Sequence, residues 1–140
     1  LLMDDFAHHP TAVQHTLQAI SQAYPQRRLW AVFEPASATN ARALFEERYL
    51  AAFALAPHVL IAGVPRPERA QGDAPFCPER LASKLRATGI EAVHLHDATE
   101  IVSHLCDRSR PGDLILFMSN GGFAGVQKQL LTKLQNRYAP

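Results

Sequence analysis

The spacing of apolar residues along the chain alternates between a helical and a strand-like pattern. In residues 11–24 apolar side chains recur at three- and four-residue steps, which predicts an amphipathic helix capped by Thr11 or a neighbour. Residues 28–33 are a short run of β-forming residues, and 113–118 is a continuous apolar run of the kind buried on both faces of a sheet. The same patterns predict further strands at 1–6, 58–64 and 92–95 and further helices at 40–56, 79–88, 98–108 and 126–136.

Turn signals separate these elements. Gly89 is placed to cap the helix before it, residues 65–78 form one long loop, and the glycine-rich residues 119–125 join the last strand to the last helix. Strands and helices alternate along the whole length, which is the pattern of parallel βαβ units. We therefore predict a single α/β domain over residues 1–140, built as a three-layer, doubly wound, mostly parallel sheet with helices on both faces.

Composition excludes several classes of partner. The 140 residues are 47% hydrophobic and 19% charged, as in one ordinary globular domain. The formal net charge is +1, and Arg27-Arg28 is the only pair of adjacent basic residues, so we expect no nucleic-acid partner. The longest apolar stretch, 50–64, is interrupted at Pro57 and is shorter than the roughly 20 residues of a membrane span. With no secretory pattern at its start, the chain is expected to be cytoplasmic and without membrane contact.

Cysteine and histidine positions give little support for a disulfide or a metal site. Cys77 and Cys106 are far apart in sequence and lie outside any CxxC motif, so ordinary free thiols are expected. His94 and His96 could share one face of a strand, with Asp97 following. Because no further ligand lies at a typical spacing, we expect no metal site.

Three polar segments follow predicted strands, at 4–11, 34–42 and 119–125. In a doubly wound sheet, ligands bind beyond the carboxyl ends of the strands, so these segments are the candidates for a site. The glycine-rich segment does not match the dinucleotide motif, because Asn120 occupies the place of its first glycine, and the chain has no GxxxxGK[ST] phosphate loop. Its glycines fit either a tight strand-to-helix turn or a backbone loop that faces a ligand.

The first polar segment combines two carboxylates with two imidazoles in Asp4-Asp5-Phe6-Ala7-His8-His9-Pro10-Thr11. A carboxylate here could bind ribose hydroxyls, and a histidine could bind a phosphate or accept a proton from an amine. A turn that caps the following helix would have a similar sequence, so both interpretations stay open.

Three blocks of the sequence resemble the C-terminal domains of Mur ligases. Residues 4–11 resemble the family block DDYAHHPT, 32–35 (VFEP) resemble the FEP block of murein peptide ligases, and 112–123 (GDLILFMSNGGF) are similar to their GDxILxMSNGGF. The blocks occur in family order and span the chain from end to end. The resemblance implies a Rossmann-like domain from a longer, three-domain enzyme, and the start at Leu1-Leu2-Met3 also suggests a fragment.

The resemblance also implies an activity for the whole enzyme. Murein peptide ligases join UDP-N-acetylmuramate to the tripeptide L-alanyl-γ-D-glutamyl-meso-diaminopimelate through an acyl phosphate, in cell-wall recycling that serves cell shape and division. ATP and Mg²⁺ would be held mainly by a central domain, and an N-terminal domain would hold the UDP-sugar. The implied partners of this chain are therefore these two domains and both substrates, and the chain alone should be inactive.

The resemblance assigns roles residue by residue. Asp5 matches an aspartate near the ATP ribose, and His8 matches a histidine near the γ-phosphate and the incoming amine, which makes it the candidate catalytic residue. The candidates for binding the peptide are Ser119, Asn120, Gly121, Gly122 and, on the second segment, Arg42. Three departures concern the same segments: Phe6 replaces a tyrosine and removes its hydroxyl, and Ala36 and Ala38 replace an arginine and an asparagine.

Two alternatives remain at this point. Muramate–alanine ligases have similar C-terminal domains, but their second block reads FQP and their last strand leads to a GAGN-like loop, unlike Glu34 and residues 118–123 here. The chain could also be a non-catalytic α/β binding module. An upstream reading frame that encodes a GKT phosphate loop would favour a ligase.

Overall fold

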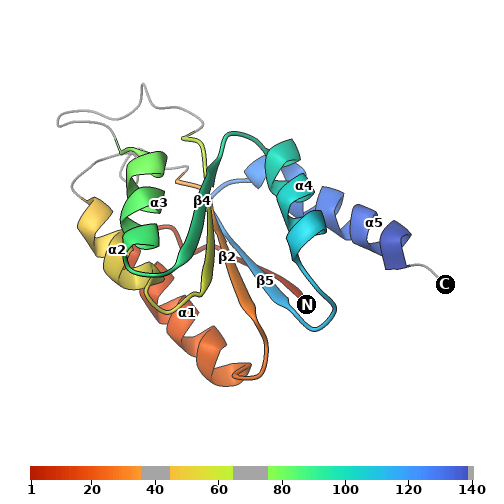
Figure 1. Ribbon diagram of the computed structural model, residues 1–140, viewed down its shortest axis with the longest axis horizontal. Helices are drawn as coiled ribbons and strands as arrows, with labels where there is room; N and C mark the ends of the chain where they lie inside the picture. The colour runs from red at the N-terminus through yellow and green to blue at the C-terminus, as the bar shows by residue number, and fades with distance from the viewer. Residues whose placement is uncertain (36–44, 65–75, 139–140) are drawn as a thin grey trace.

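Five parallel strands form the centre of the molecule. The computed structural model describes residues 1–35, 45–64 and 76–138. The strands are β1 (Leu2–Asp5), β2 (Leu29–Phe33), β3 (His58–Ala62), β4 (Glu91–Leu95) and β5 (Leu114–Met118), in the spatial order β1-β5-β2-β3-β4. Every neighbouring pair is parallel. In this order β5, the last strand of the chain, lies between the first two strands, β1 and β2 (Figure 1).

Burial explains why these segments are strands. All residues of β2 and β5 are buried, because both strands are covered by helices on both faces. The edge strands β1 and β4 are only partly buried. The continuous apolar runs predicted from the sequence are thus the central strands of the sheet.

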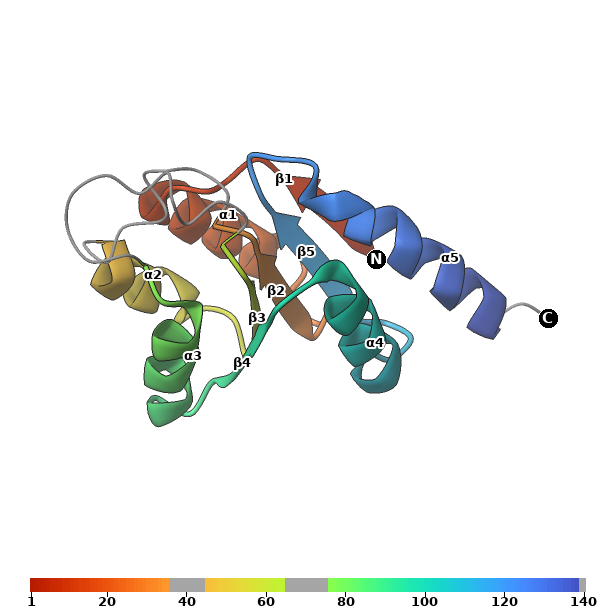
Figure 2. The ribbon, with the colours of Figure 1, turned by 90° about the horizontal axis from the view of Figure 1, so that it is seen from above.

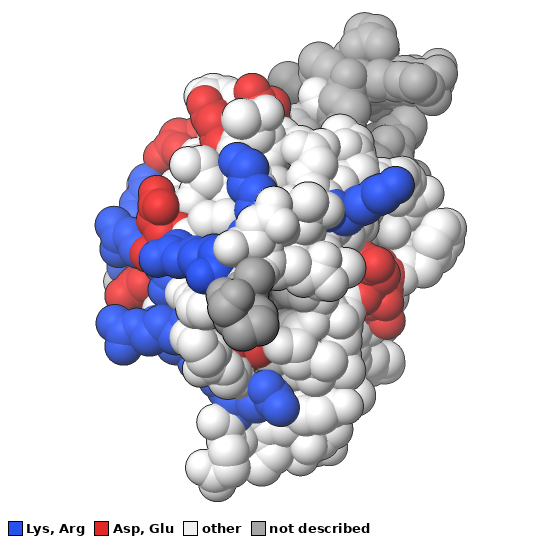
Figure 3. Space-filling model, turned by 90° about the vertical axis from the view of Figure 1, so that its right-hand side faces the viewer, with Lys and Arg blue, Asp and Glu red and all other residues white. Residues whose placement is uncertain are grey.

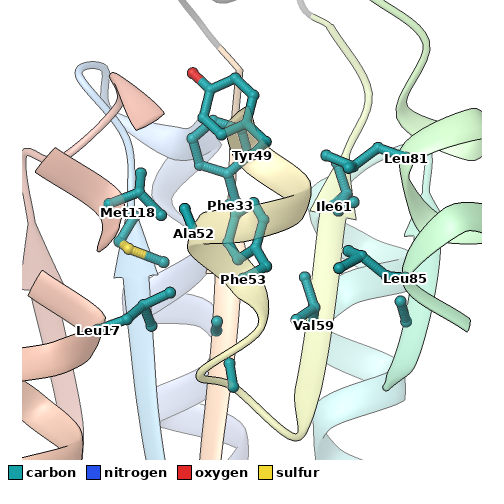
Figure 4. Close-up of a cluster of buried hydrophobic side chains, with 14 of the residues drawn as sticks. Leu17, Phe33, Tyr49, Ala52, Phe53, Val59, Ile61, Leu81, Leu85 and Met118 are labelled. Atoms are coloured by element: carbon teal, nitrogen blue, oxygen red, sulfur yellow. The ribbon is translucent and has the colours of Figure 1, made fainter. Parts of the chain in front are cut away.

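Helices cover both faces of the sheet. α1 (Pro10–Ala23), α2 (Glu46–Phe53) and α3 (Pro78–Ala87) lie on one face, and α4 (Ala98–Arg108) and α5 (Val126–Tyr138) lie on the other (Figure 2). Figure 4 shows the first core, in which Phe33 and Ile61 of the sheet pack against Tyr49 and Phe53 of α2 and Leu81 of α3. The second core lies between the other face and α4 and α5. These layers confirm the predicted three-layer, doubly wound α/β fold.

Helix ends agree with the sequence in one case and differ in two. α3 ends in the predicted glycine cap, since Gly89 has φ +90° and the Gly89 and Ile90 amides donate to the carbonyls of Arg86 and Leu85. Thr11 is not the cap of α1, because Pro10, with its fixed φ, takes the first helical position instead. The helix predicted at 40–56 is observed as α2, which ends at Phe53 rather than at residue 56, and residues 40–44 lie outside the described ranges.

Candidate functional site

The strand order creates a divide at the carboxyl end of β5. The chain leaves β1 and β2 toward α1 and α2 on one face, whereas it leaves β5 toward α5 on the other face (Figure 2). Because β5 lies between β1 and β2, neighbouring loops separate at its carboxyl end. This is the switch point at which doubly wound sheets bind ligands.

Backbone hydrogen bonds join the three predicted polar segments at this point. The Ser119 amide donates to the Asp5 carbonyl at 3.1 Å, and the Glu34 amide donates to the Met118 carbonyl at 3.0 Å. The exits of β1, β2 and β5 are therefore fixed relative to one another. Residues 36–42 of the second segment lie outside the described ranges, so the predictions for Ala36, Ala38 and Arg42 stay predictions.

Two hydrogen bonds through the Ser119 side chain link Glu34 to the glycine-rich loop. The Ser119 hydroxyl donates to Glu34 Oε1 at 2.7 Å, and the Gly121 amide donates to Ser119 Oγ at 2.9 Å. Glu34 is only 9% exposed, and this burial raises the pKa of its carboxyl group although the Ser119 hydrogen bond acts in the opposite direction. Glu34 was not among the site residues predicted from the sequence; an acidic residue that directly follows a buried apolar run is the signal that could have indicated it.

Asp5 has a structural role and a free oxygen. Its Oδ1 accepts hydrogen bonds from the Ala7 amide at 2.7 Å and from Thr16 Oγ1 at 3.3 Å, so the carboxylate holds the turn that leads into α1. No described residue donates to Oδ2. Both interpretations of the first polar segment are thus compatible with one side chain, since one oxygen holds the turn and the other can accept from a ligand hydroxyl.

The geometry of His8 determines which ring nitrogen is available to a ligand. Its Nδ1 lies 2.8 Å from the Phe6 carbonyl oxygen, which can only accept, so Nδ1 carries the hydrogen in a neutral ring. Nε2 is then the unprotonated nitrogen and can accept a proton or a hydrogen bond. The His8 carbonyl accepts from the buried Tyr49 hydroxyl, which fixes the backbone below the ring. Phe6 is 70% exposed and packs edge-on against His8, with the ring centroids 5.3 Å apart.

The glycine-rich loop uses one of its glycines as a turn residue, since Gly125 has φ +67°, but its other glycines are not all required in this way. Gly122 has φ −78°, which any residue can adopt, and a Cβ added there would meet no atom within 4 Å. The left-handed residues that follow include two non-glycines, Phe123 at φ 46° and Ala124 at φ 47°. Such residues carry on the order of 1–2 kcal/mol of backbone strain each, and burial of Phe123 against Phe117 offsets part of it. A glycine is therefore not required at 122 by the local fold.

Three of the predicted site residues, Asp5, Ser119 and Gly121, border a hollow of about 320 Å³, which we call the carboxyl-end crevice. His8, Asn120 and Gly122 are not in its lining. It is lined by Asp4, Asp5, Phe6, Phe117, Ser119, Gly121 and Gln127. Gln127 comes from the first turn of α5 and was not predicted, because its place at the crevice depends on the direction in which α5 leaves the sheet.

A larger hollow of about 540 Å³ lies at the opposite end of the sheet, near the amino ends of β2, β3 and β4. We call it the amino-end hollow; its lining includes Arg28, His58, Arg86 and Glu91. Several of its side chains have partners within the protein: Arg28 lies 2.6 Å from Asp113, His58 lies 2.9 Å from Glu91, and Arg86 lies 2.6 Å from Glu79. Arg108 and Arg110, which also line the hollow, form no ion pair with a described residue. Figure 3 shows basic side chains gathered along one side of the face that carries α4 and α5, with acidic side chains among them. The ion pairs thus occupy part of the charge of this hollow.

The described residues contain no group of three histidine, cysteine, aspartate or glutamate side chains that could hold a metal ion. The His94 and His96 rings do meet, with centroids 4.7 Å apart, but Asp97 instead caps α4 by accepting from the Glu100 amide. Cys77 and Cys106 are free thiols at α3 and α4, on opposite faces of the sheet. None of the described helices is long and apolar enough to cross a membrane.

Comparison with known proteins shows the class to which this fold and site belong. Residues 1–121 match the model of the family described as "Mur ligase, glutamate ligase domain". The chain therefore belongs to the family of Mur ligase C-terminal domains, which confirms the resemblance seen in the sequence.

The individual relatives include two kinds of ligase. A crystal structure of a murein peptide ligase from Psychrobacter arcticus superposes with a TM-score of 0.81 and 34% identity, covering 100% of this chain and 28% of that chain. A domain from a putative UDP-N-acetylmuramate:L-alanyl-γ-D-glutamyl-diaminopimelate ligase of Haemophilus ducreyi gives a TM-score of 0.70 and 30% identity, covering 95% of this chain and 89% of that chain. Among curated relatives, the UDP-N-acetylmuramate–L-alanine ligase of Desulfitobacterium hafniense is 31% identical over 94% of this chain. The chain spans 29% of that relative's length.

Proposed function

We propose that this chain is the C-terminal domain of an ATP-dependent ligase that joins UDP-N-acetylmuramate to L-alanyl-γ-D-glutamyl-meso-diaminopimelate. The whole enzyme would have three domains and would act in the cytoplasm, where ATP and the nucleotide sugar are available. The substrate carboxylate would be phosphorylated, and the peptide amine would displace phosphate from the acyl phosphate to form the amide. This domain would receive the peptide and, on closing against the central domain, exclude water from the reacting groups.

The main observation that supports a peptide substrate is the contact between Glu34 and Ser119. These are two of the positions at which the sequence resembles murein peptide ligases and differs from muramate–alanine ligases. They come from different strands, yet the Ser119 hydroxyl donates to Glu34 at 2.7 Å. Residues that distinguish the two enzyme classes thus act as one unit beside the carboxyl-end crevice. The similarity to a murein peptide ligase structure over the whole chain supports the same choice.

Each candidate residue has a group free for its proposed role. Asp5 Oδ2 would accept hydrogen bonds from the hydroxyls of the ATP ribose, while Oδ1 keeps the turn in place. His8 Nε2 would accept a proton from the incoming amine or bind the phosphoryl group. Asn120 has an amide that both donates and accepts, and Gly121 and Gly122 leave the backbone open, which suits the carboxylates and amides of a peptide.

The fit to ATP and Mg²⁺ is unequal. A carboxylate oxygen at the switch point suits a ribose, so Asp5 fits one part of the nucleotide. The described residues offer neither a phosphate loop nor a cluster of metal ligands. The phosphates and Mg²⁺, which supply the phosphoryl transfer, would therefore be held mainly by the central domain.

A second candidate is the C-terminal domain of a muramate–alanine ligase. It is favoured by curated relatives with that activity, such as the Desulfitobacterium hafniense enzyme. The two candidates differ in the amine substrate alone, so a substrate assay separates them.

The test uses the full-length enzyme that contains this domain, with UDP-N-acetylmuramate, ATP and Mg²⁺. The tripeptide and L-alanine are offered separately and then in competition, and the products are identified by mass. We expect the tripeptide adduct to form with a kcat/KM far above that for L-alanine. Preferential formation of the alanine adduct would favour the second candidate, and no adduct with either amine would contradict both.

A further inference from the structure

We propose that Glu34 is a positioning residue that holds the Ser119–Gly121 turn in the conformation that receives the incoming peptide. Glu34 does not line the carboxyl-end crevice, whereas Ser119 and Gly121 do. Its effect on a ligand would therefore pass through Ser119. The proposal rests on the proposed function for its substrate, but its structural part stands on contacts within this chain.

Three contacts fix the orientation of Ser119. Its amide donates to the Asp5 carbonyl at 3.1 Å, which holds the backbone. Its hydroxyl has a single hydrogen, and Glu34 Oε1 accepts it at 2.7 Å. With the hydrogen directed at Glu34, the oxygen lone pairs are left for the Gly121 amide, which donates at 2.9 Å. By accepting from the Ser119 hydroxyl, Glu34 thus fixes the position of the Gly121 amide, two residues further along the loop.

The charge of Glu34 matters for this relay. A hydrogen bond to an ionised acceptor is stronger than one between neutral groups, so a carboxylate orients the hydroxyl more firmly than an amide oxygen does. A glutamine at this position would still accept from Ser119, and an alanine would not. The expected order of loop rigidity is therefore glutamate, then glutamine, then alanine.

The stability of the fold gives no reason for an ionised group at this position. Burial disfavours the carboxylate and raises its pKa, and the described partner of its side chain is a neutral hydroxyl. Glu46, which is 3% exposed, differs because Arg80 and Lys84 both lie within ion-pair distance. A buried acid without such pairing is better explained by what it does to the crevice than by stability.

Asn120 and Gly122 flank the amide that this relay fixes. If Gly121 is held, the backbone of its two neighbours, Asn120 and Gly122, is held with it. Pre-organisation of this kind lowers the entropy lost when a ligand binds, so it raises the affinity for the peptide. It does not act on the nucleotide side, where Asp5 holds its own turn.

The structural part is tested on the 140-residue chain by amide hydrogen exchange measured with NMR. Glu34→Ala should raise the exchange rate of the Gly121 amide about three- to ten-fold, as expected for the loss of one ordinary hydrogen bond. Glu34→Gln should give a smaller rise, and Glu34→Ala should add little in a Ser119→Ala background. The Ala7 amide, bonded to Asp5, serves as the internal control. Glu46→Gln is the matched control variant, since it alters a buried glutamate away from the loop.

The functional part is tested in the full-length enzyme. Glu34→Ala should raise the KM for the peptide about ten-fold and leave the KM for ATP unchanged, with Glu34→Gln restoring part of the loss. An unchanged Gly121 exchange rate in folded Glu34→Ala would overturn the proposal at once. A looser Gly121 amide with wild-type peptide KM would overturn its functional part. If the wild-type enzyme ligates no peptide, the proposed function fails as well, while the exchange result is unaffected and still decides the structural part.

Discussion

Two buried glutamates in this small domain are in opposite electrostatic situations. Burial raises the pKa of Glu34, and its one described side-chain partner is the neutral hydroxyl of Ser119. Burial acts in the same direction on Glu46, but hydrogen bonds from Arg80 and Lys84 outweigh it and hold the pKa of that carboxyl below its ordinary value. At the scale of single residues, folding therefore favours the ionised form of Glu46 and disfavours the ionised form of Glu34.

These directions predict opposite effects of the same substitution on thermal stability. A raised folded pKa means that Glu34 contributes stability below its unfolded pKa of about 4.3 and loses it as pH rises through the folded pKa. Glu34→Gln should accordingly leave Tm unchanged or higher at pH 7. Glu46 contributes above its unfolded pKa and loses this as pH falls through the folded pKa, so Glu46→Gln should cost about 1–2 kcal/mol at pH 7 and less at pH 3.

Thermal melts of the two variants and the wild type between pH 3 and pH 7 check this pair. The difference between wild type and Glu34→Gln should grow toward neutral pH, and that for Glu46→Gln should shrink toward acid. A large loss of stability in Glu34→Gln at pH 7 would mean that the carboxylate is a structural group after all.

Asp5 and His8 should have separable effects on the full-length enzyme. Asp5→Asn keeps an oxygen that can accept from the Ala7 amide but removes the charge, so ATP binding should weaken by about 1.5–3 kcal/mol, or 10- to 150-fold. His8→Ala should reduce kcat more than ATP affinity, because Nε2 is placed for the amine or the phosphoryl group. Asp107→Asn, an exposed change on α4, is the control for loss of a charge. Wild-type kinetics in both variants would mean that residues 4–11 only form the turn that leads into α1.

At the scale of elements, the loop between β5 and α5 contains a glycine, Gly122, that can be replaced without a steric clash. The structure accepts a side chain at Gly122, where an added Cβ meets nothing within 4 Å. A side chain at Gly63 is less easily placed, because its Cβ would lie 3.0 Å from the His96 carbonyl oxygen and the backbone would have to move by a few tenths of an ångström. The local fold therefore does not require a glycine at 122.

Substitutions in this loop should therefore change peptide binding without unfolding the domain. Gly122→Val and Asn120→Ala should raise the KM for the peptide about ten-fold, as expected when one or two hydrogen bonds or a close approach are lost, and leave the KM for ATP nearly unchanged. Circular dichroism should show both variants folded, whereas Gly63→Ala should lower Tm. Folded variants with wild-type peptide kinetics, or with a loss of ATP affinity instead, would contradict the assignment.

The sequence predicts the elements of this fold but not the contacts between residues that lie far apart in the chain. Periodicity located all ten strands and long helices found in the described ranges, because each buries a face whose spacing is visible in the sequence. The left-handed backbone at Phe123 and Ala124 was not predictable, since neither residue type favours it and burial of Phe123 helps to impose it. Glu34 was likewise missed as a site residue, because its importance depends on Ser119, 85 positions away in sequence. Contacts between distant strands are what local patterns cannot supply.

At the scale of the whole molecule, the two ends of the sheet have different polar groups. At the amino ends, Asp113 accepts hydrogen bonds from Arg28, from Trp30 and from the Arg110 amide, which ties β5 to β2 and to the preceding turn. At the carboxyl ends, no described residue makes a hydrogen bond with Asp5 Oδ2 or His8 Nε2. Charges therefore stabilise the fold at both ends of the sheet, because Glu46 pairs with Arg80 at the starts of α2 and α3, whereas the groups proposed for the chemistry lie at the carboxyl end.

The chain alone should fold without turning over ATP. It has no GxxxxGK[ST] loop, and its described residues offer no cluster that could hold Mg²⁺. We expect no magnesium-dependent phosphate release above the level of a preparation of Asp5→Asn purified in parallel. ATP turnover by the wild-type chain that this variant lacks would show that phosphate-binding groups are present in the chain itself.

The most direct measurement for the central claim is the location of the peptide on the 140-residue chain. The amide resonances of the labelled domain are followed by NMR while L-alanyl-γ-D-glutamyl-meso-diaminopimelate is added to millimolar concentration, with L-alanine as the control ligand. We expect the largest shifts at Ser119, Asn120 and Gly121, with His58 and Glu91 of the amino-end hollow unaffected and with weaker changes for L-alanine. Shifts centred on the amino-end hollow, or no shifts in the glycine-rich loop, would contradict the claim that the carboxyl-end crevice receives the peptide.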